Sequence, residues 1–71
     1  MSIRIKLAEA LAKRRLSIVE LSDRTGIAVH DLEVLRDQKA MALRLKTLEA
    51  LCRGLNCPPG DLLELSDGES N

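Results

Sequence analysis

Residues 18–37 read IVELSDRTGIAVHDLEVLRD, and this stretch decides the fold. Ser17, just before it, and Glu20 have the spacing of a capping box, which predicts that a helix begins at this serine. Gly26 suits the left-handed residue that ends such a helix. A second helix is expected almost at once, from a cap at Ala28 to about Asp37. Two short helices joined through a tight turn with a glycine form a helix-turn-helix unit.

Helices are also expected on both sides of this unit. Before it, the pattern predicts a helix over about 5–14, with an apolar stripe of Leu7, Ala8, Leu11 and Ala12. After it, residues 38–44 read as a loop and residues 45–55 as a helix, and the segment NCPPG at 56–60 ends that helix. A short fifth helix is predicted over about 61–65. We therefore predict an all-α fold, a compact bundle of four to five helices.

The domain organisation follows from length and charge. A chain of 71 residues has room for one domain, which we place at 1–65, with an acidic flexible tail at 66–71. Eleven basic residues balance eleven acidic ones, and a net charge of zero argues against nucleic acid as a partner. Three of the acids lie after residue 63, however, so residues 1–63 are weakly basic, with eleven basic and eight acidic side chains.

The composition disfavours several classes of function. The chain has no Phe, Tyr or Trp, whereas proteins that bind single-stranded nucleic acid usually stack bases on aromatic side chains. Two cysteines, Cys52 and Cys57, and one histidine are too few for a structural zinc site. We expect both cysteines to pack as small hydrophobes, with a redox bridge between them as the alternative.

Catalysis and membrane association are not expected either. The sequence shows no nucleophile–base pair and no glycine-rich phosphate loop, so we expect no enzyme activity, no cofactor and no small-molecule substrate. It also shows no signal peptide and no stretch of membrane-spanning length. No membrane partner and a cytoplasmic location are therefore expected.

Residues 18–37 resemble the twenty-residue helix-turn-helix of the Cro and phage-repressor type, the XRE family. In that pattern the fourth position is apolar, the fifth small and the ninth glycine, and the tenth, fifteenth and eighteenth are apolar. The corresponding residues here are Leu21, Ser22, Gly26, Ile27, Leu32 and Leu35. Residues 45–65 are also similar to the fourth and fifth helices of short stand-alone members. The resemblance implies a lambda-repressor-like bundle that binds duplex DNA, with the helix over about 28–37 in the major groove.

The resemblance also implies which residues contact DNA. They lie at the start of the first helix of the unit, on the exposed face of the second, and in the cationic stretch that follows. The candidates are Ser17, Ile18, Ala28, Val29, His30, Glu33, Val34, Arg36, Lys39 and Arg44. The cations, together with Lys46, are expected along the phosphate backbone. The reading positions hold four apolar residues, one histidine and one acid, so the bidentate donors that read guanine or adenine are missing.

Two functions remain open at this point. The first is a duplex DNA-binding transcription regulator. The alternative is a protein-interaction module that kept the scaffold and reduced or lost DNA binding, which the neutral charge and the apolar reading positions favour. Val29 and Val34 suit thymine methyl groups, a protein partner or plain exposure to solvent. Any exposed side chain among Met41, Leu43 and Leu45 suits a two-fold contact, so a homodimer is also expected.

Overall fold

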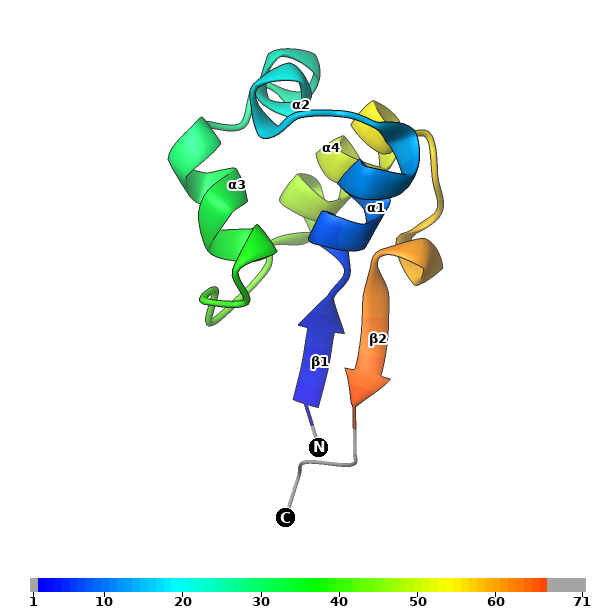
Figure 1. The fold of residues 1–71 in the computed structure, drawn as a ribbon. Coiled ribbons are helices and arrows are strands. Elements are labelled where there is room, and N and C mark those ends of the chain that lie inside the picture. The colour runs from blue at the N-terminus through cyan, green and yellow to red at the C-terminus, as the bar shows by residue number, and fades with distance from the viewer. Residues whose placement is uncertain (1, 67–71) are drawn as a thin grey trace.

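The computed structural model of the chain describes residues 2–66, and helices make up most of them (Figure 1). In order, the elements are β1 (Ser2–Ile5), α1 (Leu7–Arg14), α2 (Ile18–Thr25), α3 (Val29–Arg36), α4 (Leu45–Leu55), the 3-10 turn η1 (Pro59–Asp61) and β2 (Leu63–Ser66). The predicted all-α bundle with a helix-turn-helix is confirmed. Of the acidic tail predicted at 66–71, residues 67–71 lie outside the described residues.

The two ends of the described chain form a small antiparallel ribbon that the sequence analysis did not predict. Strands β1 and β2 pair from Ser2 opposite Ser66 to Ile5 opposite Leu63. The first helix consequently begins at Leu7 rather than near residue 5, and the fifth helix predicted over 61–65 is wrong. Isoleucines at 3 and 5 and leucines at 63 and 65 alternate with polar residues, a period that suits strands. A helix of about five residues, by contrast, is too short to repay its nucleation cost.

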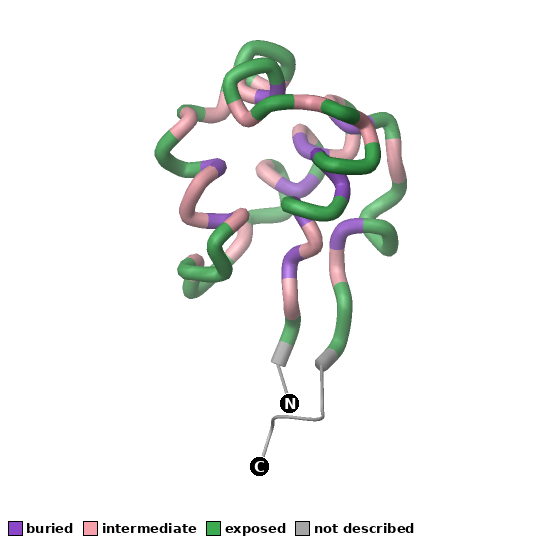
Figure 2. Tube along the Cα trace, in the orientation of Figure 1, coloured by how far each residue is buried: buried purple, intermediate pink, exposed green. Residues whose placement is uncertain are grey.

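The core is made almost entirely of leucine. Nine of the eleven buried hydrophobic residues are leucines, and five of these are completely buried, namely Leu7, Leu21, Leu32, Leu51 and Leu62. One comes from each helix and the fifth from the junction of η1 and β2, so every part of the fold contributes to one cluster (Figure 2). On α1 the predicted stripe is wrong in part, because Ala10 is buried and Ala8 and Ala12 are exposed.

The turn between α2 and α3 is held by hydrogen bonds at both of its ends. Gly26 has a φ of 77°, the left-handed conformation expected at the end of α2. The Ser22 hydroxyl donates to the carbonyl of Ile27 over 2.6 Å. The Thr25 hydroxyl donates to the carbonyl of Leu21 over 2.8 Å and accepts from the N–H of Ile27 over 3.1 Å. These bonds fix the direction in which α3 leaves the turn.

Helix α4 packs against the C-terminal part of α2, which leads into this turn. At Gly54 a β-carbon would lie 2.7 Å from the Thr25 Cγ2 methyl and 3.2 Å from Leu21 Cδ1, so only glycine allows α2 and α4 to approach so closely. Arg24 of α2 donates to the Gly54 carbonyl over 3.2 Å. Arg14 of α1 donates to the next carbonyl, that of Leu55, over 2.7 Å. The C-terminal end of α4 thus binds two other helices.

Candidate nucleic-acid interface

Helix α3 lies at one side of the molecule and presents a face that points away from the core (Figure 1). Leu32 and Leu35 are buried beneath it, as predicted. Of the predicted reading residues, Ala28 and His30 are exposed, and Val29, Glu33 and Val34 are half-buried. Ala28 is the N-cap residue and makes no side-chain cap bond, so the start of α3 is open. The structure brings these five positions together on one short helix.

The N-terminus of α2 is the second part of the candidate interface. The predicted capping box is present, because the Ser17 hydroxyl accepts from the N–H of Glu20 over 3.0 Å and the Glu20 carboxylate accepts from the N–H of Ser17 over 2.9 Å. This bond to the backbone lowers the pKa of Glu20 below its ordinary value. Ile18 is half-buried and packs against the core, so what it offers a ligand is its backbone N–H.

The cations after α3 are not equivalent. Arg36 is bound to its neighbour Asp37 through two contacts, of 2.9 Å and 3.2 Å. The hydrogen bond from Arg36 lowers the pKa of Asp37 and raises that of Arg36, so the two charges balance one another. Lys39 and Arg44 are exposed and form no ion pair with any residue in the range 2–66. These two, with Lys46, are therefore the cations that remain available to a phosphate.

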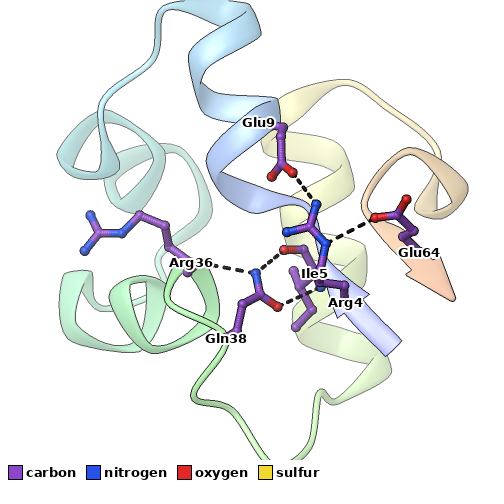
Figure 3. A network of polar contacts seen from close by, with 6 residues as sticks. All are labelled: Arg4, Ile5, Glu9, Arg36, Gln38 and Glu64. Atoms are coloured by element: carbon purple, nitrogen blue, oxygen red, sulfur yellow. Dashed lines mark hydrogen bonds and ion pairs between the residues drawn. The ribbon is translucent and has the colours of Figure 1, made fainter. Parts of the chain in front are cut away.

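Gln38, which the sequence analysis assigned only to a loop, binds the backbone of Ile5 just after the end of α3 (Figure 3). Its side-chain amide donates to the carbonyl of Ile5 over 2.5 Å and accepts from the N–H of the same residue over 3.0 Å. Gln38 itself is left-handed, with a φ of 62°. The segment after α3 is thereby tied to β1, which lies 33 residues earlier. No local pattern marks this role, because the partner is a backbone far away in the sequence.

Most of the other arginines form contacts within the fold. Arg4 forms ion pairs with Glu9 and, over 3.2 Å, with Glu64, which raises the pKa of Arg4 and lowers that of Glu9 (Figure 3). Arg53 is paired with Glu49 over 2.8 Å on the surface of α4. Arg14, part of the basic run at the end of α1, donates to backbone carbonyls of α1 and α4. Charge counts alone therefore overstate the number of cations available to a ligand.

The remaining candidate groups form no reactive centre in the described part of the chain. Cys52 and Cys57 are free and half-buried, and burial raises the pKa of the Cys52 thiol, which disfavours the reactive thiolate. Within residues 2–66 no three His, Cys, Asp or Glu side chains are placed to hold a metal ion. None of the helices described is both long enough and apolar enough to cross a membrane.

Comparisons with known proteins agree with this geometry. The family model of the Cro/C1-type HTH DNA-binding domain matches residues 6–68. The chain is 49% identical over 69 residues to a Bacillus subtilis (strain 168) protein named as the uncharacterized HTH-type transcriptional regulator YozG, and the match covers 97% of this chain and 82% of that protein. No solved structure matches the chain.

Proposed function

The chain belongs to the Cro/C1-type helix-turn-helix DNA-binding family and is a DNA-binding transcription regulator, and we propose that it docks α3 in the major groove of duplex DNA. The observation that carries this proposal is the outward face of α3, which the fixed α2–α3 turn holds and which is followed in the chain by Lys39 and Arg44, two cations with no ion pair within residues 2–66. The core side of α3 is closed by Leu32 and Leu35, so its opposite side is the one that can face a groove.

The proposal divides the candidate residues into two groups. Ser17 and the backbone N–H of Ile18, at the N-terminus of α2, contact phosphate, because helix N-termini bind anions. Lys39 and Arg44 contact phosphate beyond the end of α3 and position the domain without reading sequence. Arg36 reaches the same backbone through the guanidinium nitrogen that Asp37 leaves free.

Base recognition falls to the outward face of α3. Its members are the exposed Ala28 and His30 and the half-buried Val29, Glu33 and Val34. The valines suit thymine methyl groups, and the Glu33 carboxylate can accept from the amino group of cytosine. Both are weaker determinants than a bidentate arginine on guanine, so we expect modest discrimination by a single domain. The proposal therefore includes a homodimer on two half-sites, and a cytoplasmic location.

The test is the salt dependence of binding to a mixed-sequence duplex, followed by fluorescence anisotropy from about 50 mM salt upward. We expect dissociation constants of roughly 1–100 µM and a negative slope of log affinity against log salt. Lys39→Ala combined with Arg44→Ala should reduce the magnitude of that slope by about two, since each phosphate contact contributes about one.

Arg53→Ala is the matched control for Arg44→Ala, because both residues are exposed arginines of the α4 segment. Arg53 lies at the far end of the helix and is already paired with Glu49, so its removal should leave the slope unchanged. No binding by the unmodified protein at the lowest salt would contradict the proposal. If Arg53→Ala and Arg44→Ala reduced the salt slope equally, the assignment of Arg44 to the phosphate-binding surface would be contradicted.

A protein-interaction role for the same face is the competing hypothesis. The pairing of Arg36 with Asp37 favours it, because this pairing removes one cation from the end of α3. Val29→Asp combined with Val34→Asp would abolish binding of a protein partner, whereas the variant of Lys39 and Arg44 would leave such binding nearly intact. The two pairs of substitutions therefore separate the two roles.

A further inference from the structure

The two cysteines of the chain meet at the C-terminal end of α4. This helix ends at Asn56, which is left-handed with a φ of 54°. The N–H of Asn56 donates to the carbonyl of Arg53 over 3.4 Å, and the N–H of Cys57 donates to the carbonyl of Cys52 over 3.0 Å. These two bonds define a Schellman motif, in which the residue after the left-handed position packs back on the last turn of the helix. Here both members of that contact are thiols.

The geometry of this contact allows a covalent bond between the two sulfurs. The 3.0 Å hydrogen bond between the backbones of Cys52 and Cys57 holds their Cα atoms within roughly 7 Å of each other, the upper limit for a disulfide. Burial raises the pKa of the Cys52 thiol, and a hydrogen bond with the Cys57 thiol raises it further, so the two side chains are in contact. Both thiols are free.

A small reagent can reach this pair. Both cysteines are half-buried and line an open depression of about 630 Å³ beside the end of α4. A depression of this size admits a small molecule. The charged side chains in its wall, Glu49 and Arg53, are paired with each other over 2.8 Å. The two thiols are therefore what the depression offers to a reagent that reacts with sulfur.

We propose that Cys52 and Cys57 are a modification site that forms a reversible disulfide on reaction with a low-molecular-weight disulfide. The Cys57 thiolate attacks one sulfur of the reagent, which gives a mixed disulfide and releases one thiolate. The Cys52 thiolate then attacks the Cys57 sulfur and expels the second thiolate of the reagent. Two protein thiols are oxidised and one reagent disulfide is reduced to two thiols, which take up the protons that the cysteines lose.

The pair differs from a catalytic cysteine in how it reacts. The raised pKa of Cys52 leaves little thiolate at neutral pH, so the first attack falls to Cys57 and Cys52 acts second. In the second step the contact between the two side chains offsets the scarcity of thiolate, because the effective concentration of one sulfur at the other is high. We therefore expect slow formation of the mixed disulfide and rapid closure of the bridge.

The bridge encloses the carbonyls that bind α1 and α2. Residues 54 and 55 lie between the two cysteines, and their carbonyls accept from Arg24 over 3.2 Å and from Arg14 over 2.7 Å. A covalent ring at this point therefore constrains the part of α4 that packs on the helix-turn-helix unit. The inference does not depend on the proposed function, because closure of the bridge requires no DNA.

The test treats the reduced full chain with oxidised glutathione at neutral pH, alkylates the remaining thiols and measures the mass. We expect a monomer that has lost two hydrogens, carries no glutathione and regains both thiols with dithiothreitol. Cys52→Ser and Cys57→Ser are the matched controls, because each keeps one thiol and should stop at the mixed disulfide. Cys52→Ser should form it faster, since Cys57→Ser retains the thiol whose pKa burial raises.

The same reaction in concentrated urea tests the role of the fold. We expect the bridge to be favoured over the mixed disulfide at least about tenfold more in the folded chain, because the fold holds the thiols in contact. An equal preference in urea would overturn that role. Unmodified protein that keeps both thiols, carries glutathione on both, or forms bridges only between copies would overturn the inference. Faster reaction of Cys57→Ser than of Cys52→Ser would overturn the assigned order of attack.

Discussion

Several single side chains connect distant parts of this chain by binding backbone atoms rather than other side chains. Arg14 and Arg24 bind carbonyls at the end of α4, and Gln38 binds both polar groups of Ile5. The Gln38 amide thus forms the two hydrogen bonds at the edge of β1 that a neighbouring third strand would otherwise form. Its loss would leave the N–H and C=O of Ile5 without their partner, which costs more than the bonds themselves contribute.

We predict that Gln38→Ala lowers the free energy of unfolding by about 1–3 kcal/mol, because it removes both bonds to a half-buried backbone. Gln38→Gly should cost less by about 1 kcal/mol, since glycine has no penalty at the φ of 62° that this position adopts. Urea unfolding followed by circular dichroism measures both values. An alanine variant as stable as the unmodified protein would show that these bonds contribute nothing in solution.

Single-residue properties of the candidate interface were only partly predictable. The outward positions of Ala28 and His30 follow from helical periodicity and are as expected. The neutralisation of Arg36 by Asp37 and the tethering role of Gln38 did not appear in the sequence analysis. Whether an arginine is available to a ligand depends on side-chain geometry and on partners from other segments, and periodicity contains neither.

At the scale of the elements, the close contact of α2 with α4 determines how firmly the turn is held. The Thr25 methyl faces Gly54, while the Thr25 hydroxyl is occupied by Leu21 and Ile27. If the Thr25 side chain rotated away from a larger residue at position 54, it would therefore lose both hydrogen bonds. Glycine is a poor helix former, and its presence at position 54 near the end of α4 is explained by the close approach of α2.

We predict that Gly54→Ala destabilises the protein although alanine favours helix. Overpacking against the fixed Thr25 side chain costs about 1–3 kcal/mol, and the gain in helix propensity returns at most about 1 kcal/mol. A net loss of about 1 kcal/mol corresponds to a fall in Tm of roughly 4–8 °C. Gly60→Ala is the control, because nothing lies within 4 Å of a β-carbon there. Equal melting temperatures for the two variants would refute the contact.

The elements with strong local signals were predicted well, and those that depend on remote pairing were not. The capping box at Ser17, the left-handed Gly26 and the span of α4 are all found as expected. The ribbon was missed because each strand has only four residues and its partner lies about sixty positions away in the sequence. Because this pairing was missed, the residues of β2 and the end of η1 were predicted to form a fifth helix over 61–65.

At the scale of the whole molecule, the proposed DNA contacts and the proposed dimer make one joint demand on the DNA. Two copies related by a two-fold axis place two α3 helices on one side of the duplex, so the preferred site must be nearly palindromic. Each α3 carries weak base-reading groups, and most of the discrimination between sites must then come from binding two half-sites at once. The spacing of the half-sites becomes as important as their sequence.

We therefore predict that affinity for a selected palindromic site depends on the helical phase of its halves, which should lie roughly 10–10.5 base pairs apart. Inserting five base pairs rotates one half-site to the opposite side of the duplex, so one dimer cannot contact both and affinity should fall to that of an isolated half-site. Anisotropy titrations of the parent site, the extended site and a single half-site measure this directly. Equal binding of the unmodified protein to the parent and extended sites would mean that each domain binds independently, whatever its state of association without DNA.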